Sequence, residues 1–326
     1  MMNEHPAMKN TNRQLENTGT GSINGSRKDR AMAEVAAQII FTVCAAAAIV
    51  AVAAICIYMV RNGLPALFTV GIKEILFSTE WAPTAAEPKY GILLVILTSI
   101  VGTSLAILLG VPVGLLTAVF IAEVAHKNLV KVVQPAVELL AGIPSVVYGL
   151  LGIYLLKPVM YKLERFVFAG STTHQYTGGA NLISAVIVLA IMILPTVINV
   201  STSSLKAVPM ELRSASLALG ASPVQTIFKV TIPAAHSGII SAIVLGVGRA
   251  IGEAMAITLV SGSSVNVPLP FNSVRFLTTA IVSEMGYASG THRQVLFTIG
   301  LVLFVFIMII NVALTKGLKK KEEDHG

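Results

Sequence analysis

Hydrophobic residues in this chain gather into long runs that are separated by shorter polar segments. Each run is close to or longer than the ~20 residues that a helix needs to cross the hydrocarbon core of a bilayer. The pattern therefore predicts an all-α integral membrane protein with six transmembrane helices. The six runs cover roughly residues 35–60, 91–122, 135–156, 182–200, 237–261 and 295–315.

The second run is long enough to be one tilted helix, or two helices broken near Pro112. Positive charge separates the alternatives, because Lys and Arg concentrate on the cytoplasmic side of membrane proteins. Six spans place 14 Lys and Arg on the side of the N-terminus and 8 on the other, whereas a split second run gives 10 and 12. We therefore expect six spans with both termini in the cytoplasm. Gly110 and Gly114 then form a small-residue face for close helix packing.

Composition supports the membrane class. Hydrophobic residues make up 55% of the chain and charged residues only 12%, against roughly 25% charged residues in a soluble domain. The net charge of +7 comes from residues that orient the spans, so we expect membrane lipid and no nucleic acid as a partner. Cys44 and Cys56 lie on one predicted helix, too far apart for a disulfide.

The chain divides into three parts. Residues 1–30 are polar and rich in Asn, Thr, Ser and Gly, a composition typical of a disordered tail, here cytoplasmic. Residues 31–316 form the transmembrane domain, which includes a polar loop at 201–236. Residues 317–326 form a charged cytoplasmic tail.

The loop at 201–236 predicts two short amphipathic helices. Pro209 begins the first helix, Gly220 ends it, and Ser222-Pro223 opens the second as N-cap and first helical residue. Such a pair either docks on a partner or lies on the lipid surface, and the scarcity of lysine favours the partner. The candidate docking residues are Glu211, Leu212, Ala215, Leu219, Gly220, Ile227 and Pro233.

Two charged residues, Arg249 and Glu253, interrupt the fifth run near its middle. An arginine at mid-bilayer costs at least ~2.5–3.5 kcal/mol, and such residues face the interior of a bundle. Glu253 is four residues further on and is placed to pair with Arg249 on one helix. The pair is either a structural link between helices or part of an anion path, because the guanidinium fork matches phosphate or carboxylate oxygens.

Prolines in three runs are candidate helix hinges. Pro144 removes a backbone hydrogen bond from the third run, beside Ser145 and Tyr148. A kink with polar side chains either forms part of a gate on the substrate path or is ordinary helix packing. Pro112 and Pro195 leave the same two alternatives open.

No motif for other chemistry accompanies these features. The chain has no G-x-x-x-x-G-K-[ST] loop, no cluster of Cys and His, and no arrangement for nucleophilic catalysis. We therefore expect a transport subunit that is no enzyme, binds no metal or cofactor, and takes its energy from a partner. The alternative is a secondary transporter coupled through Arg249 and Glu253, but no inverted repeat is evident.

The polar loop resembles the "EAA" loop of ABC-importer permeases. Gly220 is followed by nine residues and then Val230-Thr-Ile232-Pro233, as in that motif, although Ser214 stands where the usual glutamate lies. Further segments resemble phosphate permeases of the PstC type: ELLAGIPSVVYGLLG (138–152), GRAIGEAMAITLVSG (248–262), VRFLTTAIVSEMGYASG (274–290) and HRQVLFTIGLVLFVFIMIIN (292–311).

This resemblance implies a type I ABC-importer permease in a bacterial plasma membrane. It implies that this chain forms half of a path for phosphate and that Arg249 and Glu253 take part in transport. The implied partners are a PstA-like second permease, a dimer of PstB-like ATPase subunits that bind ATP and Mg²⁺, and a PstS-like binding protein outside. A permease for sulfate or molybdate remains the alternative, because one arginine does not distinguish these anions.

Overall fold

A computed structural model describes the backbone of residues 7–323 and the side chains of residue 32 and residues 34–313. Contacts divide the chain into residues 1–58 and residues 59–326. The first part consists of most of helix α1 (Ala7–Ala66). This helix includes much of the segment expected to be a disordered tail, but the side chains of residues 1–31 lie outside the described residues. The disorder of residues 1–30 therefore stays a prediction, as does the charged tail at 317–326.

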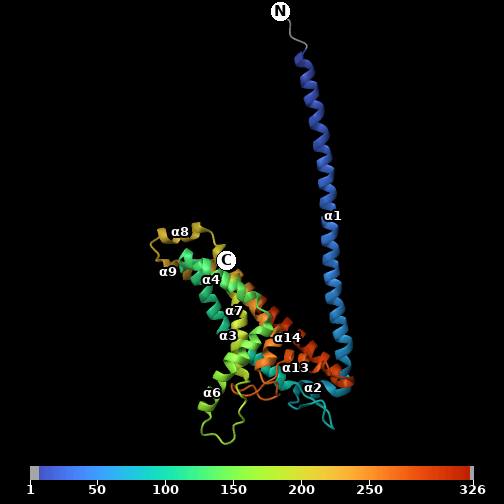
Figure 1. Ribbon diagram of the computed structural model, residues 1–326, viewed down its shortest axis with the longest axis vertical. Helices are drawn as coiled ribbons and strands as arrows, with labels where there is room; N and C mark the ends of the chain where they lie inside the picture. The colour runs from blue at the N-terminus through green and yellow to red at the C-terminus, as the bar shows by residue number, and fades with distance from the viewer. Residues whose placement is uncertain (1–6, 324–326) are drawn as a thin grey trace, which may run out of the picture. The chain divides into compact units, whose positions relative to one another are not determined.

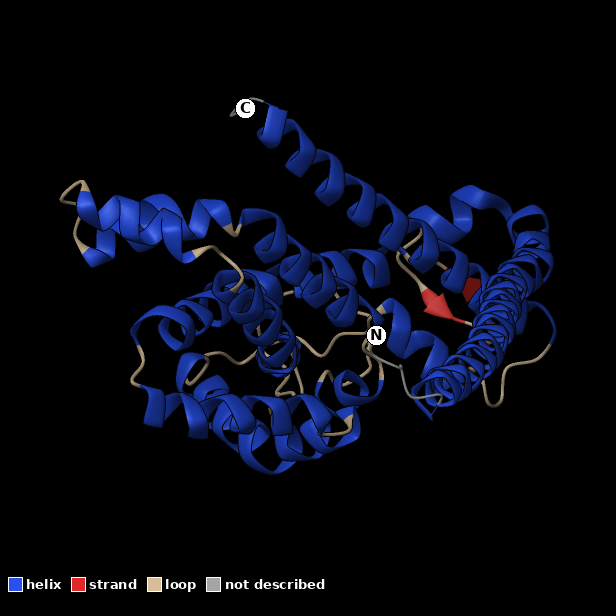
Figure 2. Cartoon of the chain, turned by 90° about the horizontal axis from the view of Figure 1, so that it is seen from above, coloured by secondary structure: helices blue, strands red, loops and turns tan. Residues whose placement is uncertain are grey.

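The structure confirms a helical membrane protein. Five helical stretches are long and apolar enough to cross a membrane: Glu34–Phe77, Leu93–Val124, Ser145–Val167, Leu182–Lys206 and Gly290–Ala313. A sixth is obtained when Pro223–Ala234 and His236–Gly252, which meet at 70°, are counted as one broken span. Figure 2 shows that helices dominate and that strands form only a small feature. The strands β1 (Trp81–Ala82) and β2 (Lys89–Tyr90) pair antiparallel.

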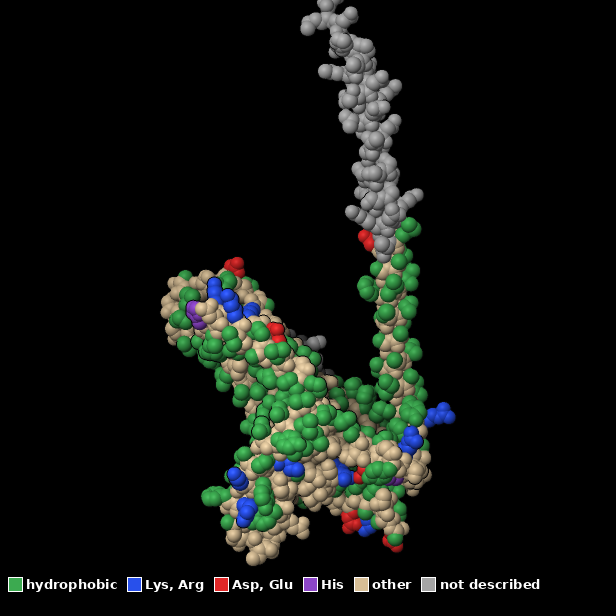
Figure 3. Space-filling view, in the orientation of Figure 1, with side chains coloured by type: hydrophobic (Ala, Val, Ile, Leu, Met, Phe, Trp, Pro, Cys, Tyr) green, Lys and Arg blue, Asp and Glu red, His purple; other side chains and the backbone are tan. Residues whose placement is uncertain are grey.

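Within residues 59–326 the helices have two distinct ends (Figure 1). One end, which we name the loop end, carries α4 (Lys127–Gly142), α8 (Met210–Ala218) and α9 (Pro223–Thr226). The opposite end carries α2 (Ile72–Phe77), α6 (Lys157–Val167) and α13 (Leu277–Glu284). Figure 3 shows mainly hydrophobic side chains between these ends, as a surface in contact with lipid requires.

Helices α3 (Leu93–Val119) and α7 (Leu182–Lys206) form the centre of the bundle. A Cβ atom added to Gly110 would lie 2.6 Å from Cδ1 of Ile193, and one added to Gly114 would lie 2.9 Å from Cγ1 of Val197. The two glycines therefore let α3 approach α7 closely, which confirms their predicted packing role. Pro112 lies between them inside an unbroken helix, so the second run is one span.

Helix α11 (His236–Gly252) packs against both α7 and α3. A Cβ on Gly246 would lie 2.9 Å from Cγ2 of Val197, and one on Gly238 would meet the Ser204 side chain. Glycines at the crossings thus bring three spans together. Helix α14 (Gly290–Glu323) packs on α13, and its Thr298 hydroxyl donates to the Gly63 carbonyl at 2.7 Å.

The third span is displaced from its predicted position. The run at 135–156 is divided at Pro144, which has extended backbone geometry (φ −57°, ψ 140°) and ends the helical path after α4. The span instead runs through α5 (Ser145–Leu151), the π-helical segment η3 (Gly152–Leu156) and α6. Helix α4 stands separately at the loop end. A proline and its predecessor disfavour helical geometry, so the chain breaks here where the sequence analysis expected only a kink.

The fifth span is also broken, where the sequence predicted one helix over 237–261. Helix α11 ends at Gly252, Glu253 is extended (φ −73°, ψ 130°), and α12 (Met255–Val260) begins a new helix. A second bend lies before α11, where α10 (Ile232–Ala234) meets it at Ala235. Non-helical backbone at membrane depth is tolerated where protein or water satisfies its polar groups.

Candidate functional site

Arg249 lies in the last turn of α11 and is partly exposed. It lies thirteen positions after His236, at the loop-end start of α11, which places it about 20 Å along the helix axis. Gly248 and Gly252 are both exposed, and a Cβ on either would meet nothing within 4 Å. The helix surface next to Arg249 is therefore open, so a solute or a second subunit has access to this level of the span.

Glu253 forms the break rather than an ion pair. Its Oε1 accepts a hydrogen bond from the Ala256 amide at 3.0 Å, and its carbonyl accepts one from the Thr278 hydroxyl at 2.7 Å. The side chain thus caps the first turn of α12, and the backbone is held by α13. Among the residues whose side chains are described, no ion pair joins Arg249 to Glu253. The pairing expected on one continuous helix is therefore absent from this conformation.

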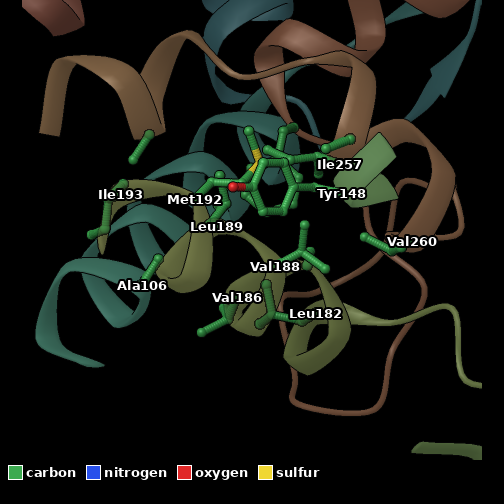
Figure 4. Packing of buried hydrophobic residues seen from close by; sticks show 14 of the residues in the cluster. Ala106, Tyr148, Leu182, Val186, Val188, Leu189, Met192, Ile193, Ile257 and Val260 are labelled. Atoms are coloured by element: carbon green, nitrogen blue, oxygen red, sulfur yellow. The ribbon is translucent and has the colours of Figure 1, made fainter. Parts of the chain in front are cut away.

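Tyr148 lies against the same break. Its ring is buried in a cluster with Met192, Ala250 and Ile257 (Figure 4). Its hydroxyl donates to the Leu140 carbonyl at 2.6 Å, and its ring shares a cluster with Ala250, the residue that follows Arg249. The structure therefore brings Tyr148, Arg249 and Glu253 into one region, at the junction of α5, α11 and α12.

Glycines make the contact between α5 and α12 possible. A Cβ on Gly149 would lie 2.6 Å from Cδ1 of Leu259 and 3.0 Å from Cα of Ala256. Ser145 is the first residue of α5, one turn from Tyr148, and is partly exposed. The third span thus supports the broken fifth span directly.

The candidate hinges occupy different settings. Pro144 lies at the break between α4 and α5, whereas Pro112 and Pro195 lie inside the continuous helices α3 and α7. Pro195 is buried. Of the three, only Pro144 coincides with an interruption of its helix.

The polar loop forms the predicted helix-turn-helix. Gly220 has a φ of +85°, a left-handed geometry suited to glycine, and turns the chain after α8. The Ser222 hydroxyl accepts from the Gln225 amide at 3.2 Å while the Gln225 side chain accepts from the Ser222 amide at 2.9 Å. This capping box starts α9.

The outer surface of the loop exposes apolar side chains. Leu219 is 89% exposed, and Leu212, Val224 and Phe228 are also exposed. Glu211, Ala215 and Pro233 are exposed as well. Ile227 differs, because it packs inward against a cluster of Ala118, Leu205 and Ala235. Six of the seven candidate docking residues therefore lie on the accessible side of the loop.

One contact of the loop was missed by sequence reasoning. Arg213 Nη1 donates to Glu123 Oε2 at 3.0 Å, and Nη2 donates to the Leu205 carbonyl at 2.7 Å. The partners are 90 and 8 residues away along the chain. The local sequence therefore gives no signal for this link between α8 and the spans.

The opposite end holds a second missed cluster, around Glu284. This glutamate is only 4% exposed and forms an ion pair with Arg275. Trp81 Nε1 donates to its Oε1 at 3.1 Å, and His292 Nε2 lies 2.7 Å from its Oε2. The buried carboxylate thus connects the β1–β2 hairpin, the segment before α13 and the start of α14.

A second buried glutamate, Glu164, fixes the loop after α6. It is fully buried, and its Oε1 lies 2.9 Å from His174 Nε2. The amide and hydroxyl of Thr177 donate to the same carboxylate at 2.9 and 3.1 Å. The His174 ring stacks on Phe168 with centroids 3.7 Å apart. The hydrogen bonds of Glu164 and Glu284 therefore hold the loops at the opposite end of the bundle in place.

Among the described residues, no group of three His, Cys, Asp or Glu is placed to hold a metal. A polar cavity of about 180 Å³ lies between α4 and α7 at the loop end, lined by Gln134, Glu138, Asn199, Thr202 and Lys206 among others. Its lining includes one acidic side chain, Glu138, and one basic side chain, Lys206. It does not include the candidate path residues.

Comparisons with known proteins agree with this architecture. Residues 110–321 match the family described as "Binding-protein-dependent transport system inner membrane component". The chain is 40% identical over 294 residues to the "Probable ABC transporter permease protein YqgH" of Bacillus subtilis, covering 87% of this chain and 92% of that one. It is 32% identical over 298 residues to the "Phosphate transport system permease protein PstC" of Xylella fastidiosa strain 9a5c, covering 87% and 91%.

A further relative is PstC of Pasteurella multocida, 31% identical over 262 residues and covering 76% of this chain and 81% of that one. A solved structure of the methionine ABC transporter MetNI in an inward-facing conformation is also similar. Its TM-score is 0.48 at 21% identity, covering 71% of this chain and 94% of that one. The chain therefore belongs to the family of binding-protein-dependent transport system inner membrane components and is a permease subunit of an ABC transporter.

Proposed function

We propose that this permease conducts inorganic phosphate into a bacterial cell. Arg249 carries the proposal: it is a partly exposed guanidinium on an open helix surface within a span, and its expected partner Glu253 is occupied elsewhere. A free guanidinium fork matches the oxygens of a phosphate. Several relatives that share most of the chain are named phosphate permeases.

Six spans form half of a transport path, so a second, PstA-like permease completes it. The open surface at Gly248 and Gly252 faces this partner or the path between the two subunits. Arg249 makes transient contact with the passing anion, and Tyr148 and Ser145 line the adjoining region. Glu253 shapes the path through the break that it caps.

Energy comes from ATPase subunits that dock on the helix-turn-helix. The family requires an ATPase and a binding protein as partners. We propose that a PstB-like ATPase dimer, which binds ATP and Mg²⁺, covers the exposed apolar residues of α8 and α9. A PstS-like protein delivers phosphate to the opposite end, where the Glu164 and Glu284 clusters order the loops. In this arrangement the loop end and both termini are cytoplasmic.

The test is uptake of labelled phosphate at low external concentration, in cells that lack this chain and in cells in which it is restored. Other phosphate transporters are deleted, and excess unlabelled sulfate or molybdate serves as competitor. Restored uptake that neither competitor suppresses supports the proposal. Suppression by sulfate or molybdate assigns that oxyanion instead. Uptake that persists after removal of the ATPase points to a secondary transporter.

A further inference from the structure

Helix α8 is held to the spans mainly by polar contacts. It contains no buried residue, and its apolar side chains Met210, Leu212 and Leu217 are exposed. Apolar packing therefore contributes little to its position. A side-chain hydrogen bond joins it to α9, since the Ser216 and Thr226 hydroxyls lie 2.9 Å apart.

Arg213 provides the contact with the transmembrane core. Nη1 donates to Glu123 Oε2 and Nη2 lies near Oε1, both at 3.0 Å, while Nη2 also donates to the Leu205 carbonyl at 2.7 Å. The Arg213 and Glu123 side chains are only 16% and 8% exposed. Two hydrogen bonds from one guanidinium, to Glu123 Oε2 and to the Leu205 carbonyl, fix its direction as well as its distance, which a lysine would not do.

The acceptors of Arg213 belong to the two central spans. Glu123 lies in the π-helical segment η2 (Phe120–Val124), which ends the second span, and Leu205 lies near the end of α7. Leu205 is fully buried in a cluster with Ala118 and Val119. The side chain thus reaches the point at which the second and fourth spans pack together.

The rest of the loop contacts the second and fourth spans at the same cluster and also continues into the fifth span. Ile227 and Ile232 pack on the same cluster, and α10 continues through Ala235 into α11. Movement of this half therefore passes along the chain to the helix that carries Arg249. Among the described residues of α8, Arg213 forms the hydrogen bond and the ion pair to the second span, so it is the polar contact by which α8 acts on that span.

We propose that the Arg213–Glu123 ion pair transmits movement of the ATPase-docked helix α8 to the second span. Both residues are positioning residues for transport and do not touch the substrate. The inference rests on the proposed docking of the ATPase on α8. Removing one partner leaves the other charge buried without compensation. Substitution of either residue alone should therefore impair transport, and exchange of the two charges should restore part of it.

The test uses the complete transporter, reconstituted in vesicles with its second permease, ATPase and binding protein. The variants are Arg213→Gln, Glu123→Gln, Arg213→Lys and the exchanged pair Arg213→Glu with Glu123→Arg. The readouts are phosphate transported per ATP hydrolysed and the stimulation of ATP hydrolysis by the binding protein. Lys206→Gln is the matched control, because Lys206 also joins two elements at the loop end, donating to Gln134 Oε1 at 3.0 Å, but is exposed.

We expect both single Gln variants to assemble and to lose at least about fivefold in phosphate transported per ATP, the lower range of a coupling energy between sites. Arg213→Lys loses less, and the exchanged pair recovers part of the loss. Recovery is partial because Glu at position 213 cannot donate to the Leu205 carbonyl. The Lys206→Gln control stays at the wild-type ratio.

Normal transport per ATP in both Gln variants would overturn the inference. Loss of assembly in both, without recovery in the exchanged pair, would also overturn it, because the contact would then be structural only. The proposal that phosphate is the substrate is contradicted by a different result, namely that the wild-type complex takes up no phosphate. Stimulation of ATP hydrolysis by the binding protein then still tests the ion pair.

Discussion

The Thr278 hydroxyl donates a hydrogen bond to the Glu253 carbonyl at 2.7 Å. This bond joins α13, at the opposite end of the bundle from α8 and α9, to the break in the span that carries Arg249. Glu284, at the end of the same helix α13, is the centre of a buried polar cluster. The loops at this end of the bundle and the centre of the proposed path therefore share one short helix.

Thr278→Val should destabilise the break. The substitution keeps the shape of the side chain but leaves a carbonyl without its donor, at a cost of about 1–3 kcal/mol. We expect a lower Tm of the purified permease and reduced phosphate uptake. Thr278→Ser restores the donor and serves as the control. Wild-type Tm and uptake in Thr278→Val would show that the bond has no role.

Arg249→Ala should abolish phosphate uptake while the complex still assembles. Arg249 is partly exposed on α11, so its removal leaves little unfilled space in the core. Arg249→Lys keeps the charge but loses the planar fork, and we expect intermediate uptake. Uptake is measured in cells, and assembly by co-purification with the ATPase. Normal uptake by a well-assembled Arg249→Ala transporter contradicts the assigned path.

The Glu253→Gln variant should retain most of the phosphate uptake, whereas the Glu253→Ala variant should lose it. The Glu253 carboxylate caps α12 by accepting from the Ala256 amide, and the glutamine carbonyl provides the same acceptor. Alanine removes the cap, which costs about 0.5–2 kcal/mol. Phosphate uptake by the two variants at equal expression shows whether Glu253 acts as a hydrogen-bond acceptor that caps α12 or through its negative charge. Equal, severe loss in the two variants would indicate that the negative charge itself is required.

Gly149→Val should disrupt the contact between α5 and α12. Its branched side chain would meet Leu259 and the backbone of Ala256, where even a Cβ lies at 2.6 and 3.0 Å. Such overpacking costs about 1–3 kcal/mol, so we expect a lower Tm and little uptake. Gly142→Val is the matched control, because a Cβ there meets nothing within 4 Å. The proposed contact is wrong if both variants behave alike.

Glu284→Gln should loosen the opposite end. It leaves Arg275 without its buried partner, and breaking such a pair costs about 3–5 kcal/mol. Trp81 is the single tryptophan of the chain and donates to Glu284, so its fluorescence in the purified full chain reports on the cluster directly. We expect a shifted emission and a lower Tm. Glu80→Gln, in an exposed pair, should change neither, and an unaltered spectrum in Glu284→Gln would refute the cluster.

The sequence by itself determined the class of the protein and the features that depend on neighbouring residues. Hydropathy identified the spans because transfer into lipid is summed over a continuous stretch. Ser222-Pro223 and Gly220 predicted the two short helices α8 and α9 because caps and turns are local chemistry. Gly110 and Gly114 predicted close packing because small residues on one face permit it.

Only the tertiary structure decided where the third and fifth spans are interrupted and what the buried charges contact. Hydropathy does not report which backbone groups have hydrogen-bond partners. At the break, the Glu253 carbonyl accepts from the Thr278 hydroxyl, 25 residues further along the chain. Glu284 and Trp81 are 203 residues apart, and Arg213 and Glu123 are 90 apart. A buried charge requires a partner, but the fold, and not the local sequence, brings that partner to it.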